Sequence, residues 1–178
     1  MDDAQLLRRI RFWLVLFIIG LILSGITAFP LHWEVGLLRS WLDHGSASAT
    51  PAAVLAWLNR VYAALSVVDR DYPFLAYGTD WLAFAHLVIA MAFIGPLRDP
   101  VRNRWVITFG LIACAGVVPL ALIAGQVRGI PLYWRLIDCS FGLFGVIPLL
   151  ICRSLIVKLE STGAQAQTKT TPHICATQ

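Results

Sequence analysis

Charge is the scarcest property of this 178-residue sequence. Asp, Glu, Lys and Arg make up 13% of the residues and hydrophobic residues make up 58%, whereas a soluble domain carries about 25% charged residues. With a mean hydropathy of +0.74, this shortfall excludes an ordinary soluble domain and favours an all-α integral membrane protein. The net charge of +4 is modest and the basic residues lie near predicted helix ends, so we expect no nucleic-acid partner.

Paired cysteines and catalytic signatures are also missing. None of the four cysteines stands in a C-x-x-C pair, and three lie in or beside apolar runs, which excludes a disulfide scaffold and a C-x-x-C redox centre. The sequence has no Walker loop, no G-x-S-x-G, no H-E-x-x-H and no G-x-G-x-x-G. No motif therefore identifies a cofactor, which stays unknown at this point.

Four apolar runs have the length of membrane spans, which is ~17–25 residues. They cover residues ~12–29, ~80–97, ~105–124 and ~136–157. The first run is long for the core of a signal peptide, and no A-x-A-like cleavage site follows it. We therefore expect a four-helix transmembrane bundle that forms a single membrane domain over residues 1–160.

The segment 31–68 between the first and second spans predicts a helical extracytoplasmic cap. Its first part places apolar residues near one face of a helix, and its second part begins at Pro51, a favourable first helical position. The second helix is about long enough to cross a membrane, but Asn59 and Arg60 stand at its centre, and an unpaired charge inside a bilayer is costly. We interpret residues 51–68 as a cap helix at the membrane surface, with a fifth span as the alternative.

The orientation follows from the distribution of arginine and lysine. An even number of spans brings three basic clusters to one side, which the positive-inside rule assigns to the cytoplasm. These clusters are Arg8–Arg11, Arg98–Arg104 and Arg153–Lys158. We expect both termini to be cytoplasmic in a bacterial inner (plasma) membrane, and the polar segment 161–178 to form a disordered cytoplasmic tail.

The candidate polar site is centred on His86, about five residues inside the second span. An ionisable residue at that depth usually faces the helix bundle and has a partner. We predict Asp138 as that partner, with Glu34 or His32 as the alternative. A hydrogen bond of His86 to a hydroxyl or carbonyl, a metal or haem site, and a proton-transfer role are the competing interpretations. The candidate polar site in this outer half consists of His86, Asp138, Glu34, His32, Asp80 and Arg135.

Small residues mark the predicted contact faces between helices. Gly110 and Cys114 lie in the third span, and Gly142 and Gly145 lie in the fourth. Small side chains at such positions let two membrane helices approach closely. For Asp138, an ion pair with Arg135 or a helix cap is the purely structural interpretation.

Three functions fit these features. The first is a binding or accessory subunit of a membrane assembly, which docks to another membrane protein or to a second copy of itself. The second is a small membrane enzyme or redox protein with haem or metal in the outer half of the bundle. The third is an oligomeric transporter, suggested by Pro119 and Pro148 in the middle of two spans.

Overall fold

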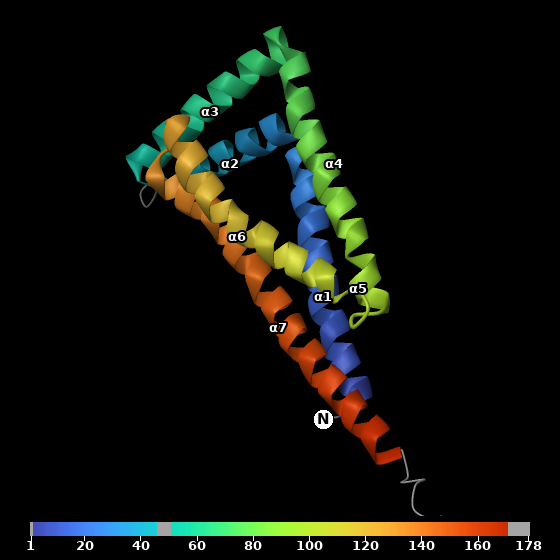
Figure 1. Cartoon of the computed structure of the whole chain (residues 1–178). Helices are drawn as coiled ribbons and strands as arrows, with labels where there is room; N and C mark the ends of the chain where they lie inside the picture. The colour runs from blue at the N-terminus through green and yellow to red at the C-terminus, as the bar shows by residue number, and fades with distance from the viewer. Residues whose placement is uncertain (1, 46–50, 171–178) are drawn as a thin grey trace, which may run out of the picture. The chain divides into compact units, whose positions relative to one another are not determined.

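The structure is a computed structural model that describes residues 2–45 and 51–170, with backbone only for 43–45 and 163–170. Its described ranges contain helices and turns and no strand (Figure 1). The helices are α1 (Asp3–Ala28), α2 (Leu31–Gly45), α3 (Ala52–Asp71), the short 3-10 helix η1 (Pro73–Ala76), α4 (Tyr77–Ala92), α5 (Ile94–Arg98), α6 (Arg104–Val127) and α7 (Leu132–Thr170). The predicted all-helical class is confirmed.

Five helical segments in the described ranges are long and apolar enough to cross a membrane. Four of them contain the predicted spans, and the fifth is α3, Ala52–Asp71. Several apolar helices of this length are the pattern of a multi-pass membrane protein. Length and composition alone admit α3 as a span, so they do not confirm the count of four.

The segment predicted as a cap does fold into two helices, α2 and α3. The second helix continues to Asp71, three residues beyond the predicted end at 68. Whether the two helices lie on the membrane surface stays a prediction.

The C-terminal segment differs from its prediction. We expected disorder from residue 161 onward, but α7 continues to Thr170. The hydroxyls of Ser161 and Thr162 donate to the carbonyl of Lys158 at 2.8 and 3.0 Å, which adds local bonds inside a continuing helix. The following alanines and glutamines are good helix formers even without an apolar period. Residues 171–178 of the predicted tail lie outside the described residues.

The contacts divide the chain into two compact units. The α6–α7 unit contains the chain up to Ile19 and from Met91 onward, and the α2–α3 unit contains Gly20–Ala90. The predicted single domain over 1–160 stays a prediction.

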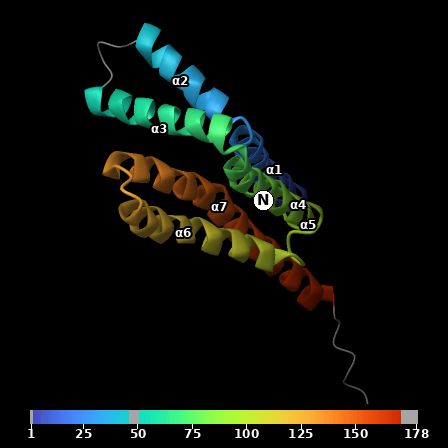
Figure 2. The same ribbon diagram turned by 90° about the horizontal axis from the view of Figure 1, so that it is seen from above.

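The α6–α7 unit is built around an antiparallel helix hairpin. Figures 1 and 2 show α6 and α7 side by side along most of their length. The hairpin turns at Gly129, whose φ of +68° is a left-handed conformation that favours glycine. The amides of Ile130 and Gly129 donate to the carbonyls of Gly125 and Gln126. This pair of bonds is the Schellman motif that ends α6.

Small residues hold this hairpin together, as predicted. A Cβ at Gly142 would lie 2.6 Å from the carbonyl oxygen of Cys114, and one at Gly145 would lie 2.7 Å from the Cys114 sulfur. Gly110 faces Leu149 of α7 and Phe93 in the same way. A side chain at Gly142 would meet the α6 backbone and push the helices apart, whereas at Gly110 and Gly145 the neighbouring side chains would have to move, so the close approach depends on small residues.

The first half of α1 packs in the same unit through one stripe. Leu6, Ile10 and Leu14 recur every four residues and are buried. The buried thiol of Cys152 on α7 donates to the Ile10 carbonyl at 3.6 Å. The ring of Phe17 lies 4.7 Å from that of Phe93. Cys152 thus acts as a small buried residue, as its place in an apolar run predicted.

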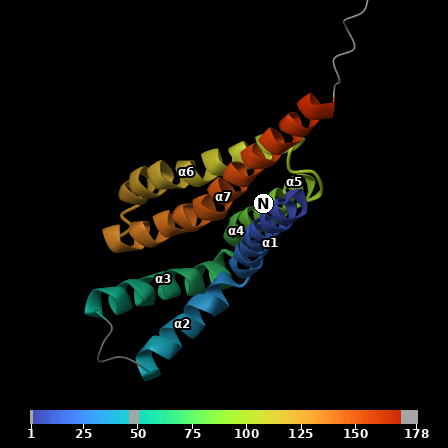
Figure 3. The ribbon, with the colours of Figure 1, turned by 90° about the horizontal axis from the view of Figure 1, so that it is seen from below.

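The α2–α3 unit contains a second hairpin. Figure 3 shows α2 and α3 side by side, and their contacts agree. In the same unit, the second half of α1 contacts α4 at Gly25, where a Cβ would lie 3.0 Å from the Ala83 carbonyl oxygen and 3.1 Å from the His86 Cβ. Ala83 is fully buried. Alanine and glycine again permit the approach of two helices.

Candidate functional site around His32

The predicted site residues are divided between the two units. His32, Glu34, Asp80 and His86 belong to the α2–α3 unit, and Arg135 and Asp138 belong to the α6–α7 unit. The pairing of His86 with Asp138 therefore stays a prediction.

His86 is half-buried and lies on the side of α4 that contacts α1 at Gly25. Its Nδ1 lies 2.8 Å from the carbonyl oxygen of Leu82, one turn earlier in the same helix. A carbonyl can only accept, so Nδ1 carries the proton in this bond. The structural interpretation of His86, a bond to a backbone carbonyl, is present in the structure. Glu34 and Asp80 are half-buried, and among the described residues of their unit neither side chain has a hydrogen bond or ion pair.

Arg135 does not pair with Asp138, so the ion pair considered for these two residues is wrong. The Arg135 Nη1 donates to the Leu122 carbonyl of α6 at 3.2 Å. Its aliphatic part crosses Gly125, where a Cβ would lie 2.5 Å from the Arg135 Cδ. The guanidinium thus lies near the C-terminal end of α6, where the helix dipole favours a cation. Asp138 is half-buried and has no hydrogen-bonded side-chain partner within the described part of its unit.

The strongest convergence of polar groups surrounds His32, where α2 meets α3. The His32 Nε2 lies 3.0 Å from the Ser66 hydroxyl, and its Nδ1 lies 3.6 Å from a carboxylate oxygen of Asp69. The imidazole also stacks on the Tyr62 ring at 5.1 Å between centroids. We call these four residues the His32 cluster. Residues 62, 66 and 69 lie three or four apart, so they share one face of α3.

The Tyr62 ring fixes the cluster against α2. A Cβ at Gly36 would lie 3.1 Å from the Tyr62 Cε2, so glycine makes room for the ring edge. The guanidinium carbon of Arg39 lies over the same ring at 5.1 Å from its centroid, a cation–π contact. His32, Gly36 and Arg39 follow one another at helical spacing, so one face of α2 holds the ring.

The proton arrangement in the His32 cluster limits its chemistry. The Ser66 hydroxyl donates to the Tyr62 carbonyl at 2.8 Å, so toward His32 its oxygen can only accept. In this arrangement the His32 Nε2 donates to Ser66, and the Asp69 carboxylate lies near Nδ1 at 3.6 Å. If the Ser66 proton turns to Nε2 instead, serine, histidine and aspartate stand in the order of a nucleophile, a base and an orienting carboxylate.

An open hollow of about 280 Å³ adjoins the cluster. Its lining residues are His32, Trp33, Gly36, Leu37 and Tyr62. The lining of the hollow therefore combines polar ring edges with apolar side chains.

Sequence reasoning included His32 but missed Ser66, Asp69 and Tyr62. Ser66 is 34 residues away in the chain, and only the pairing of α2 with α3 brings it close. Serine and tyrosine inside an amphipathic helix give no signal of their own. The aspartate resembled an ordinary charged helix end.

A metal site is not assembled in the described ranges. No three His, Cys, Asp or Glu side chains come together there as ligands, and His86 has no such set beside it. No family model, curated protein or solved structure matches this chain. Its function must therefore be argued from its own geometry.

Proposed function

We propose that this protein is a binding or accessory subunit of an assembly in the bacterial inner membrane, and that the α2–α3 hairpin engages the partner. The observation that carries the proposal is an exposed apolar stripe on α2, formed by Trp33, Leu37 and Trp41. Their exposed fractions are 65%, 48% and 65%. They recur every four residues, on one helix face. Exposed apolar surface of this kind usually marks an interaction site.

The neighbouring hollow favours a protein partner over acyl chains alone. One wall of the hollow contains Trp33 and Leu37 of the stripe, and the other contains the rings of His32 and Tyr62. A concave surface lined by both polar and apolar groups can receive a partner's side chain, and tryptophan is among the residues enriched at the hot spots of protein interfaces. The proposed partner is therefore another membrane protein or a second copy of this chain.

The composition and exposure of α3 support a four-span topology with an external cap. Leu58 is its only buried residue among those described, and Asn59 and Arg60 at its centre are exposed. A lipid-facing arginine at mid-bilayer is costly, whereas at the membrane surface both side chains reach water. With α3 outside, the basic clusters of the sequence fall on one side of the membrane. Both termini are then cytoplasmic.

The docking proposal is tested by removing the stripe. A Trp33→Gln/Trp41→Gln double variant should lose the larger complex that the wild-type protein forms, measured by native gel electrophoresis of gently solubilised host membranes. The matched control is Trp105→Gln, because Trp105 is 69% exposed and lies in the other unit. Migration of the wild-type protein as a monomer, or an equal loss in the control, would refute the docking role.

A second candidate function is a membrane hydrolase or acyltransferase with its site at the His32 cluster. It is supported by the order Ser66, His32, Asp69 with a nitrogen–oxygen distance of 3.0 Å on the serine side. In such a reaction the Ser66 oxygen would attack a carbonyl carbon, the His32 Nε2 would take the hydroxyl proton, and the leaving group would later receive it. Before this reaction, the Ser66 hydroxyl must break its hydrogen bond to the Tyr62 carbonyl.

This second candidate has a direct chemical test. A fluorophosphonate probe, which modifies activated serines, should label the wild-type protein, and Ser66→Ala and His32→Gln should each abolish the labelling. Ser154→Ala is the matched control, since the Ser154 hydroxyl is also bonded to a carbonyl four residues back, at 2.9 Å. An unlabelled wild-type protein removes the enzyme candidate and leaves the docking proposal untouched.

A further inference from the structure

The basic residues of the α6–α7 unit are the largest group of unpaired charges in its described part. Eight cationic side chains there are exposed and have no hydrogen-bonded or ion-paired partner among the described residues of that unit; Arg128 lies at the far end of α6, and the other seven lie in three segments. These seven are Arg8, Arg9, Arg11, Arg98, Arg102, Arg153 and Lys158. An exposed cation needs a counter-ion, and seven of them in one unit create a strong local field.

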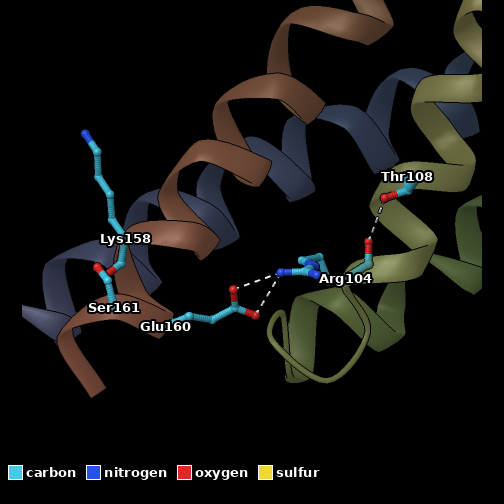
Figure 4. Close-up of polar contacts among 5 residues, drawn as sticks. All are labelled: Arg104, Thr108, Lys158, Glu160 and Ser161. Atoms are coloured by element: carbon cyan, nitrogen blue, oxygen red, sulfur yellow. Dashed lines mark hydrogen bonds and ion pairs between the residues drawn. The ribbon is translucent and has the colours of Figure 1, made fainter. Parts of the chain in front are cut away.

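The contacts of this unit bring these cations to one end of it. The start of α1 is joined to α7 by the bond between the Cys152 thiol and the Ile10 carbonyl. The start of α6 is joined to α7 by the ion pair of Arg104 with Glu160, at 2.9 Å (Figure 4). The Asn103 amide donates to the Gly95 carbonyl at 3.2 Å, which ties α5 to the turn before α6. The three basic segments therefore lie at one end of the unit, which we call the basic end.

Two of the four carboxylates of the basic end are bound within the described residues. Glu160 binds Arg104 through both of its oxygens, and Figure 4 shows Lys158 extended away from that pair. A carboxylate oxygen of Asp99 accepts the backbone amide of Arg102 at 3.0 Å. Asp2 and Asp3 lie at the start of α1, where the helix dipole favours them. The seven cations thus keep a net positive surface.

Apolar tracks lead from these cations along the helices. Phe12 and Leu16 of α1 are 63% and 48% exposed and follow Arg8 and Arg11 into the helix. Leu150 of α7 is 48% exposed and lies one turn inward from Arg153. A cationic head group site with an apolar track beside it matches the two parts of a phospholipid. A free phosphate or a nucleic acid would leave the apolar part unused.

We propose that the basic end binds the headgroups of anionic phospholipids, with Arg11 and Arg153 at the centre of the site. These two arginines directly follow Ile10 and Cys152, the residues that join α1 to α7. A step of one residue turns a helix by about 100°, so each arginine lies at the border of the contact. Guanidinium groups bind phosphate oxygens in pairs, and basic sites between membrane helices bind anionic lipid headgroups. The proposal depends on membrane insertion and not on the accessory role.

The test measures lipid binding by native mass spectrometry of the full chain, with phosphatidylglycerol as ligand and phosphatidylcholine as the zwitterionic reference. The wild-type protein should bind phosphatidylglycerol more tightly. At low salt, the Arg11→Gln/Arg153→Gln variant should bind it on the order of thirtyfold more weakly, because each surface cation contributes about fivefold. The control Arg60→Gln/Arg128→Gln removes the same charge from exposed positions outside the basic end and should change the affinity by less than about twofold.

Two further arms separate the alternatives. Arg11→Lys/Arg153→Lys keeps the charge but loses the paired guanidinium bonds. It should bind phosphatidylglycerol more tightly than the Gln variant and more weakly than the wild-type protein, which shows that the Gln variant lost charge and not its fold. Water-soluble glycerol phosphate should not displace the lipid. Equal binding of the two lipids by the wild-type protein, an equal loss in the Arg60→Gln/Arg128→Gln control, a Lys variant that binds no more tightly than the Gln variant, or displacement by glycerol phosphate would each overturn the proposal.

Discussion

The close contact between α6 and α7 allows a quantitative prediction of how Gly142→Ala changes the stability of the protein. The new Cβ would lie 2.6 Å from the Cys114 carbonyl oxygen and 3.2 Å from the Val117 Cβ, whereas ordinary Cβ contacts begin at 3.4 Å. The obstructing atom is part of a helix backbone, so relief requires the two helices to separate. Overpacking of this kind costs about 1–3 kcal/mol.

Two neighbouring glycines supply the controls. Gly116 on α6 has no atom within 4 Å of an added Cβ, so Gly116→Ala measures only the gain in helix propensity, up to about 1 kcal/mol. At Gly145 the nearest atom is the Cys114 sulfur, at 2.7 Å, and that side chain can rotate away. The expected order of stability is therefore Gly116→Ala above Gly145→Ala above Gly142→Ala.

The assay is thermal unfolding of the detergent-solubilised protein, followed by loss of the monodisperse peak in size-exclusion chromatography at one heating rate. A difference of ~2 kcal/mol corresponds to roughly 4–8 °C in Tm for a chain of this size. Gly142→Ala should melt lower than Gly116→Ala by about that amount. Equal melting of the two variants would show that α6 and α7 do not approach closely at Cys114.

Three other predictions concern the ion pair, the buried cysteine and the topology. Arg104 and Glu160 form an exposed ion pair. A double-mutant cycle with Arg104→Gln and Glu160→Gln should therefore give a coupling free energy of about 0.2–1 kcal/mol, which falls as salt is added. A larger coupling free energy that does not depend on salt would contradict this prediction. In single-cysteine variants, Cys152 (0% exposed) should resist a membrane-permeant maleimide until the protein unfolds, while the half-buried Cys139 should react; labelling of folded Cys152 argues against its packing. Reporter fusions at residues 3 and 170 should both report the cytoplasm, since four spans place both ends on one side; opposite results would assign α3 as a fifth span.

The sequence alone determined the class of this protein and most of its helices. Long apolar runs with charges at their ends can satisfy their backbone groups in lipid only as helices, so the positions of α1, α4, α6 and α7 followed from composition. Small residues at helical spacing also predicted the contact of Gly142 with Cys114, because small side chains let two membrane helices approach closely. The end of α7 was missed because alanine, glutamine and lysine favour a helix even without any apolar period.

The tertiary structure decided which polar groups meet. His32 pairs with Ser66 and Asp69 because α2 packs against α3, and Arg135 binds the carbonyl of Leu122 and not Asp138 because α6 and α7 turn back on each other at Gly129. These contacts join residues that are far apart in the chain, and their register depends on packing that no local pattern encodes. A helix face can be predicted from its own residues, but its partner depends on how another helix is placed against it.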